Sequence, residues 1–485
     1  MNRRSQNLTN LNRKWKSIII YTAAVCLLIC SAAFAATDER PVKIVSGDGA
    51  QLGSGAGLYI NGDLWVSADV MAAAGVQLSS AQNVKGFTIN VTDPAETLGI
   101  SALSELAGNS LPLYFPAHVE KGAKYFNVTG MEAITGLAIE DKGGQVCLRQ
   151  REQDEPLPSR VPAPGPISGR ISLTWEYVSH ISPNIASEPR IDGLDILSPT
   201  WFNLMDAEGD VANRASASYV NAAHSKGYSV WALVSNSFSS KLSSEFFKNQ
   251  RGMDLFIARL LAYAKLYGFD GINIDFEAMS ANDRDNFTAL MEKMSPYLSA
   301  QRLAFSIDVH RPANTNSSRS HDRAALAQCA DYIMVMTYDQ HWRTSPVAGS
   351  VASLAWVRDS LKKTLDEGVP SKKLMLGVPF YMRLWEETPV PGGKPKVKST
   401  TLTMAKADEL LASKGITPMW LEDHAQNYFE YRENGKTYKV WMEDPASIGQ
   451  KLKLVDEFSL AGMAAWRRGQ EKPEVWPTVK RSLKR

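Results

Sequence analysis

The sequence predicts an α/β protein: a (β/α)8 TIM barrel with a small inserted α+β element, preceded by a smaller, duplicated α+β domain. Short apolar runs alternate with longer amphipathic stretches over residues 169–485, prolines cluster in residues 151–168, and a pattern repeats within residues 40–150. Alternating strands and helices are typical of a barrel. At 485 residues, the chain is long enough for such a barrel and a second domain.

The composition excludes several classes of protein. With 44% hydrophobic and 21% charged residues, the chain is neither disordered nor collagen-like. The formal net charge is +2, but residues 1–35 carry five basic side chains and no acidic one, so the rest of the chain has a net charge of −3. This slight acidity gives no electrostatic reason to expect nucleic acid as a partner.

Residues 1–35 have the three parts of a secretory signal peptide. A basic stretch precedes an apolar run from Ser17 to about Cys30, and a small-x-small cleavage pattern ends at Ala35. The alternative is an uncleaved membrane anchor, because the run is near the lower length limit for spanning a bilayer. We expect cleavage after Ala35, a protein secreted to the extracellular space or cell wall, and no stable membrane insertion.

Two cysteines remain after such a cleavage, Cys147 and Cys329. They are far apart in the sequence and could pair, but two separate buried thiols are the favoured state. The chain is therefore not a disulfide scaffold, and no spacing of cysteine and histidine indicates a zinc site.

Residues 40–150 contain two similar units. Residues 65–70 lead to Gly75, and 61 residues later residues 126–131 lead to Gly136. Each unit is predicted to form a strand, a short helix that ends at the glycine, and a second strand. The pattern resembles the duplicated copper amine oxidase N-terminal-like module of bacterial surface proteins. This resemblance implies attachment to a substrate or wall, or simple spacing. It does not indicate a metal site, because His118 is the only histidine in these residues and a lone histidine is more often structural than a ligand.

Residues 151–168 separate the two regions. Five prolines fall within eleven residues, from Pro156 to Pro166. Such a segment favours an extended, semi-rigid spacer. We therefore place a linker here and the barrel over residues 169–485.

Eight apolar runs in the second region are candidate strands. Amphipathic stretches between them, such as residues 253–267, 284–298 and 352–367, are candidate helices. Between the seventh and eighth runs, residues 428–431 and 438–441 could pair as an inserted hairpin. The eight runs begin near Arg170, Leu194, Tyr228, Gly271, Arg302, Tyr332, Lys373 and Gly462.

The most informative segment ends at Glu277. Polar and apolar residues alternate from Ile272 onward, so Asn273, Asp275 and Glu277 share one face of a strand. In a barrel this face points inward, and Glu277 lies nearest the C-terminal rim, where barrel enzymes place their chemistry. Inward polar residues are costly unless they bond to one another.

Two neighbouring inward carboxyls suit acid–base chemistry. Repulsion and burial should raise the pKa of one carboxyl, leaving a protonated acid beside an ionised partner. The alternative interpretation is a buried polar cluster that only orients the barrel.

The segment Asp270–Glu277 resembles the active-site strand of glycoside hydrolase family 18, written DGxDxDxE. Residues 336–339 are similar to the sixth-strand M-x-Y-D, residues 377–381 to the seventh-strand G-x-P-x-Y, and residues 462–466 to the eighth-strand ending that carries a tryptophan. This family contains chitinases, N-acetylglucosaminidases and spore-cortex-lytic enzymes. The resemblance covers residues 169–485.

Two positions depart from the family pattern. Asn273 stands where most chitinases have an aspartate, which removes one charge that would tune Asp275. The cortex-lytic branch often has asparagine here, so the change need not remove activity. Met382 replaces a glycine that often follows the seventh-strand tyrosine, which changes the expected shape of the sugar cleft.

The resemblance implies substrate-assisted catalysis, in which the N-acetyl group of the substrate is the nucleophile. Glu277 would be the general acid and later the base toward water. Asp275 would orient the acetamido group and stabilise an oxazolinium-like intermediate, and Tyr338 would donate a hydrogen bond to the acetamido oxygen. Supporting roles are expected for Asp270, Asn273, Met336 and Asp339.

Sugar contacts are expected mainly from aromatic rings near strand ends, since flat rings stack on sugar faces. The alternative is that many of these rings belong to the core, and that the polar candidates are ordinary loop residues. The expected substrate-binding residues are Trp466, Tyr381, Trp175, Trp201, Trp231, Asn236 and Arg383.

These expectations define a secreted retaining glycosidase of N-acetylglucosamine polymers. Peptidoglycan or spore cortex is favoured over chitin, because Asn273 and residues 231–236 look more like the bacterial wall-lytic branch. The alternatives are a chitinase and a non-catalytic chitinase-like lectin, although such lectins typically lose the glutamate that is present here as Glu277. We expect a monomer. We also expect no metal and no cofactor, because protonation and the substrate acetamide suffice for the reaction.

Overall fold

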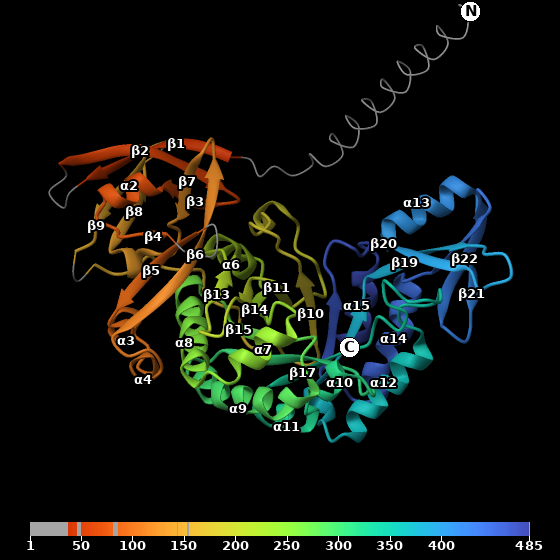
Figure 1. Ribbon diagram of the computed structural model, residues 1–485. Coiled ribbons are helices and arrows are strands. Elements are labelled where there is room, and N and C mark those ends of the chain that lie inside the picture. The colour runs from red at the N-terminus through yellow and green to blue at the C-terminus, as the bar shows by residue number, and fades with distance from the viewer. Residues whose placement is uncertain (1–36, 46–49, 81–85, 143, 153–154, 485) are drawn as a thin grey trace, which may run out of the picture.

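Three sheets organise the described part of the protein (Figure 1). The predicted signal peptide, residues 1–35, lies outside the part of the chain that the structure describes. None of the helices within that part is both long and apolar enough to cross a bilayer. The structure is a computed structural model and describes residues 37–45, 50–80, 86–142, 144–152 and 155–484.

Eight parallel strands close into a barrel, which confirms the predicted TIM barrel. The ring closes because β11 pairs with β10 on one side and β14 on the other. Each strand begins within two residues of a predicted apolar run. The strands are β10 (Ile171–Glu176), β11 (Ile196–Pro199), β14 (Ser229–Ser235), β15 (Gly271–Asp275), β16 (Ala304–His310), β17 (Tyr332–Met336), β18 (Leu374–Pro379) and β24 (Gly462–Trp466).

Helices surround the barrel and cover its outer face. Phe276, which follows β15, packs on Phe256 of α8 and Phe287 of α9, so the apolar face predicted for this segment does lie under the helices. The helices are α6 (Ala217–Ser225), α7 (Ser240–Phe246), α8 (Gln250–Tyr267), α9 (Arg284–Ala300), α10 (Asn316–Arg319), α11 (Arg323–Cys329), α12 (Leu354–Asp366), α14 (Pro445–Glu457) and α15 (Val475–Leu483).

Short elements occupy several of the connections. β12 and β13 form an antiparallel pair beside β14. The short elements are β12 (Phe202–Leu204), β13 (Val211–Asn213) and the 3-10 turns η1 (Ile185–Ser187), η2 (Ala281–Asp283) and η3 (Ser371–Lys373).

The described residues of the N-terminal region form a nine-stranded sheet with short helices. β3 and β7, the first strands of the two predicted repeats, pair antiparallel, with Val66 opposite Phe126. Only the second repeat has its predicted closing strand, because Val76 stays bonded to Met71 of α2. The elements are β1 (Thr37–Val45), β2 (Gln51–Ile60), β3 (Asp63–Ser67), α2 (Ala68–Ala73), β4 (Ser79–Ser80), β5 (Gly86–Thr92), α3 (Pro94–Leu98), α4 (Ala102–Leu106), β6 (Ser110–Glu120), β7 (Ala123–Asn127), α5 (Glu132–Thr135), β8 (Leu137–Asp141) and β9 (Val146–Gln150).

The N-terminal sheet is fastened to helix α8 of the barrel (Figure 1). The hydroxyl of Tyr263 donates to the carbonyl of Tyr114 and accepts from its N–H, both at 2.9 Å. The guanidinium of Arg251 donates to the carbonyls of Leu106 and Ala107 at 2.6 and 2.8 Å. These bonds join side chains of one region to backbone of the other, so the contact has a defined register.

The proline-rich linker lies against the barrel and does not hold the two regions apart. Arg160 donates to the carbonyls of Lys265 and Leu266, both at 2.5 Å, at the end of α8. The carbonyl of Val161 lies 2.9 Å from Nδ1 of His224 in α6. The predicted spacer is thus a strap along the barrel, because its polar groups find partners there.

A five-stranded sheet is inserted between β18 and β24, opposite the N-terminal region (Figure 1). The predicted hairpin is present, with Tyr431 opposite Tyr438 and their rings stacked at a centroid distance of 4.8 Å. The elements are β19 (Tyr381–Thr388), β20 (Lys396–Thr403), α13 (Met404–Lys414), β21 (Met419–Leu421), β22 (Gln426–Glu433) and β23 (Lys436–Trp441).

A buried polar network anchors this insertion. Glu443 and Lys451 are both fully buried, with Nζ of Lys451 at 2.8 and 3.0 Å from the two carboxylate oxygens. Gln426 of β22 and Ser447 of α14 each donate a further bond of 2.8 Å to Glu443. The carboxylate is satisfied on both oxygens, which makes the cost of burying its charge tolerable.

We predict that Lys451→Met lowers the free energy of unfolding by about 3–5 kcal/mol, because it leaves the Glu443 carboxylate buried without its counter-charge. Burial already raises the pKa of Glu443 and Lys451 offsets this rise. The loss should therefore shrink at acid pH, where Glu443 takes up a proton. Urea denaturation at two pH values measures both effects. The double variant with Glu443→Gln should recover much of the stability, and an equal loss in both variants would contradict the prediction.

Candidate active site

Asn273 lies at the centre of the barrel and ties four strands together. Its side chain is fully buried, and Nε1 of Trp175 donates to its Oδ1 at 2.8 Å. Its Nδ2 donates to Oδ1 of Asp308 at 2.9 Å, and Ser198 adds a longer bond of 3.3 Å to Oδ1. An indole N–H can only donate, so the amide oxygen must face Trp175 and the amide N–H must face Asp308.

Asp275 is buried with an unsatisfied carboxyl oxygen. It is 6% exposed, and within the described part of the chain its Oδ1 has no hydrogen-bond partner. Burial raises its pKa well above the usual range, and the negative charges of Glu277 and Asp308 raise it further. The raised pKa predicted for one carboxyl of the segment is that of Asp275, which is not the carboxyl expected to act as the acid.

Two more groups share this environment. Burial and the charge of Glu277 raise the pKa of Asp308, while the hydrogen bond from Asn273 lowers it, and the net shift is well upward. Burial also raises the pKa of Tyr338, as do the charges of Asp308, Glu277 and Asp275. The phenol of Tyr338 thus keeps its proton and can donate a hydrogen bond.

Glu277 lies just past the end of β15 and is partly open to solvent, with 27% of its side chain exposed. Its Oε2 lies 3.2 Å from Nε2 of His310 on β16. The side chain of Asn236 fixes its backbone, because Oδ1 accepts from the N–H of Glu277 at 3.0 Å and Nδ2 donates to its carbonyl at 2.6 Å. A partly exposed carboxyl on a fixed backbone can exchange a proton with a bound molecule.

His310 is backed by a second histidine that stays neutral. The rings of His310 and His321 meet edge to face, with centroids 5.7 Å apart. Burial lowers the pKa of His321 to about 3, with smaller contributions from His310 and Arg323. His321 therefore adds no positive charge behind the pair of His310 and Glu277 at neutral pH.

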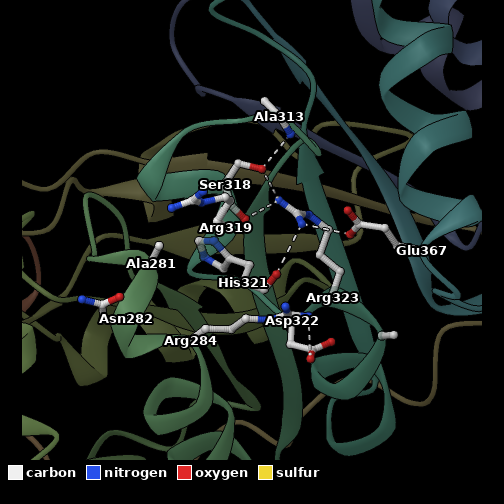
Figure 2. A pocket seen from close by; sticks show the side chains of 11 residues that line it. Ala281, Asn282, Arg284, Ala313, Ser318, Arg319, His321, Asp322, Arg323 and Glu367 are labelled. Carbon is white, nitrogen blue, oxygen red and sulfur yellow. Dashed lines mark hydrogen bonds and ion pairs between the residues drawn. The ribbon is translucent and has the colours of Figure 1, made fainter.

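A cavity of about 470 Å³ lies beyond His321, between the loops that follow β15 and β16 (Figure 2). Figure 2 shows Arg323 bonded to Ser318 and paired with Glu367. Arg284 pairs with Asp322 at 2.7 Å. None of the residues predicted for the site lines this cavity, and the ion pairs join loops and helices of the barrel wall.

Asp339, Tyr381 and Arg383 form one network beside Tyr338. The hydroxyl of Tyr381 donates to Oδ1 of Asp339 at 2.6 Å, and Arg383 donates to the same atom at 2.8 Å. Asp339 has a left-handed backbone with φ of 57°, which its two partners help to hold. The rings of Tyr338 and Tyr381 are 6.3 Å apart, so the network reaches the carboxyl cluster through Tyr338.

Two predicted aromatic residues meet at the C-terminal end of the barrel. The rings of Trp175 and Trp466 lie 6.2 Å apart, where β10 and β24 run side by side. Trp466 is partly exposed, whereas Trp175 is buried and uses its N–H on Asn273. Met336, at the end of β17, is 8% exposed and lies opposite His310 in the strand register.

Three predicted sugar contacts are corrected by the structure. Trp201 is fully buried, packs on Tyr219 and donates to Ser182, so it belongs to the layer under the helices. Trp231 is third in β14 and stacks on Tyr332 near the N-terminal end of the barrel. Asn236 is fully buried, with its amide occupied by the backbone of Glu277.

Asp270 lies at the other end of β15 from the pair that it is expected to support. Asp270 precedes β15 at the N-terminal end of the barrel, where its Oδ2 accepts from the N–H of Val230 at 2.7 Å and lies 2.9 Å from Nε2 of His224. It lines a cavity of about 710 Å³ at that end, together with Trp231 and Tyr332. Asp270 thus orders the start of β14 and β15 and does not contact Asp275 or Glu277.

Two residues of the cluster, Asp308 and His310, were missed in the sequence. The signal was present, because residues 304–310 alternate polar and apolar side chains as β15 does. With the two strands adjacent and parallel, inward residues of β16 must lie beside inward residues of β15. The site therefore holds three carboxyls, of which one is open to solvent, beside one histidine and one phenol.

Comparison with known proteins identifies this arrangement. The family described as Glycosyl hydrolases family 18 matches residues 203–471. An uncharacterized glycosylase of Bacillus subtilis, YvbX, is 25% identical over 58% of this chain and 82% of its own length. A cortical fragment-lytic enzyme of Bacillus anthracis is 27% identical over 50% of this chain and 56% of its own length.

The solved structures agree with the fold. The crystal structure of a chitinase from Chromobacterium violaceum is 24% identical and has a TM-score of 0.57, over 64% of this chain and 98% of that one. The family match extends over more than half of the chain and includes the segment that carries Asp275 and Glu277. The chain therefore belongs to glycoside hydrolase family 18 and is a glycosidase.

Proposed function

We propose that this chain is a secreted, retaining glycosidase that cleaves β-1,4 bonds next to N-acetylglucosamine, on peptidoglycan or spore cortex. The observation that carries the proposal is the pair at the end of β15: a buried carboxyl with an unpartnered oxygen, Asp275, beside a partly exposed carboxyl, Glu277. Secretion rests on the signal-peptide pattern of residues 1–35.

The two carboxyls suit different steps. Protonated Glu277 gives its proton to the glycosidic oxygen as the bond from that oxygen to C1 breaks, while the acetamido oxygen of the same sugar forms a new bond to C1. The free oxygen of Asp275 accepts from the acetamido N–H, and Tyr338 donates to the acetamido oxygen. Water then attacks C1, returns a proton to Glu277 and restores the acetamide, so the configuration at C1 is retained.

The choice of substrate rests on two observations. The relatives include cortical fragment-lytic enzymes, and Asn273 occupies a position that is aspartate in most chitinases. The N-terminal sheet, which resembles a module of bacterial surface proteins, is proposed to hold the enzyme at the wall. Chitin oligomers are the alternative substrate, and a lectin without activity is the alternative function.

We predict that Glu277→Gln lowers kcat/KM by about 10²–10⁴-fold, because glutamine has no proton to give to the leaving oxygen. The measurement is hydrolysis of N-acetylglucosamine oligomers by residues 36–485. Glu245→Gln makes the same change at an exposed position of helix α7 and should leave activity unchanged. Equal activity of Glu277→Gln and wild type would refute the assignment of the acid.

Digestion of peptidoglycan and chitin oligomers side by side tests the substrate. We expect muropeptides with N-acetylglucosamine at the reducing end, read by mass spectrometry and absent with Glu277→Gln. Chito-oligomers alone would move the assignment to chitin. Retained binding without any product would make the protein a lectin.

We predict that Asp275→Asn abolishes most activity but raises the melting temperature at alkaline pH. A carboxyl whose pKa is raised by folding contributes stability below its usual pKa and loses it as the pH rises through the raised value. The amide has no charge to bury, so the stability of the variant should fall less between pH 5 and pH 9. Scanning calorimetry at several pH values measures this, and a parallel decline in both proteins would contradict it.

A further inference from the structure

We propose that Asp308 is a positioning residue for the reaction. It lies on the neighbouring strand β16 and supplies a second buried carboxyl beside Asp275. This inference rests on the proposed function, because it concerns how the same site holds its proton. The sequence suggested that Asn273 leaves Asp275 with one charge fewer than usual. The structure shows a carboxyl in hydrogen-bond contact with that asparagine.

The contact between the two strands has a fixed direction. Asn273 is fully buried and Asp308 is 2% exposed, so water does not compete for their bond. The N–H of Trp175 requires an acceptor and takes Oδ1 of Asn273 at 2.8 Å. The amide N–H is therefore turned toward Oδ1 of Asp308 at 2.9 Å, and a flipped amide would lose both bonds.

The charges around Asp308 favour holding a proton in the site. The titratable groups that act on Asp308 or Asp275 are Glu277 on β15 and Tyr338 past β17, and His310 follows on β16 with its ring 3.2 Å from Glu277. Within the described part of the chain, no basic side chain forms an ion pair with Asp275 or Asp308. Ionising all three carboxyls would therefore place uncompensated charge inside the barrel.

This arrangement sets the range of pH in which the site is active. The charge of Asp308 opposes the loss of a proton from Asp275, so Asp275 stays protonated to higher pH. Asn273 and Asp308 together present one carboxyl and one amide. Exchanging the two residues between β15 and β16 would keep one carboxyl, one amide and the hydrogen bond between them.

The first test is the pH profile of kcat/KM for Asp308→Asn. We expect the alkaline limb to move to lower pH by about 1 unit, the size of shift that one nearby charge causes. Ser306→Ala, a buried change two residues earlier on the same strand, should keep the wild-type profile. An unchanged limb in Asp308→Asn, with only its melting temperature lowered, would overturn the proposal and leave Asp308 a structural residue.

The exchange variant Asn273→Asp with Asp308→Asn gives the second test. We expect it to return the alkaline limb to the wild-type position, whereas Asn273→Asp alone, with three buried carboxyls, should move the limb to higher pH. If Asp308→Asn does not fold by circular dichroism, the exchange variant decides, and a limb at lower pH than wild type would overturn the proposal.

The proposed function can fail separately. A wild-type protein that cleaves no N-acetylglucosamine polymer would refute the function itself. Cleavage by wild type and loss in Glu277→Gln, with pH profiles that do not respond to Asp308, would refute only the role of Asp308.

Discussion

The site depends on one constraint: a polar side chain that points into a closed barrel must find its partner on another strand of the same barrel. The bonds from Trp175 to Asn273 and from Asn273 to Asp308 meet this constraint, and they join β10, β15 and β16 at one level. The positions of the other groups follow from it. Two residues further along, β15 and β16 carry Asp275 and His310, and the next inward residue of β15 is Glu277 at the open end.

Some groups of the site lower the stability of the fold, and interactions in the surrounding structure compensate for this loss. Asp275 keeps an unpartnered oxygen in a buried position, and Asp339 holds a left-handed backbone. Elsewhere in the same barrel, apolar side chains pack outside the strands, and Glu443 and Lys451 form a satisfied buried pair. Such strain persists at a functional site because the rest of the fold over-determines it.

The barrel and the face of β15 could be predicted from the sequence because strand periodicity carries that information directly. The strand starts and the inward direction of Asn273 and Asp275 follow from alternation alone. The depth of a side chain along the barrel axis does not follow from alternation. Trp231 and Trp466 are both tryptophans on barrel strands, but one lies third in its strand and the other lies last, and only the closed register separates them.

Partners across strands were also beyond the sequence. Asn236 follows a strand like many sugar-binding residues, but its amide is used by the backbone of Glu277, which only the pairing of β14 with β15 reveals. Asp308 was missed although residues 304–310 alternate polar and apolar side chains, because its bond to Asn273 follows only from the pairing of β16 with β15.

The contact between the N-terminal sheet and helix α8 has a mechanical consequence. Tyr263 and Arg251 bond to the backbone of the sheet, and the linker is bonded along the barrel, so the sheet cannot swing as a tethered module would. A surface that the sheet binds would meet the mouth of the barrel at one angle and one depth. The shape of the rigid protein would then determine which glycosidic bonds the active site can reach. A longer linker would not extend that reach.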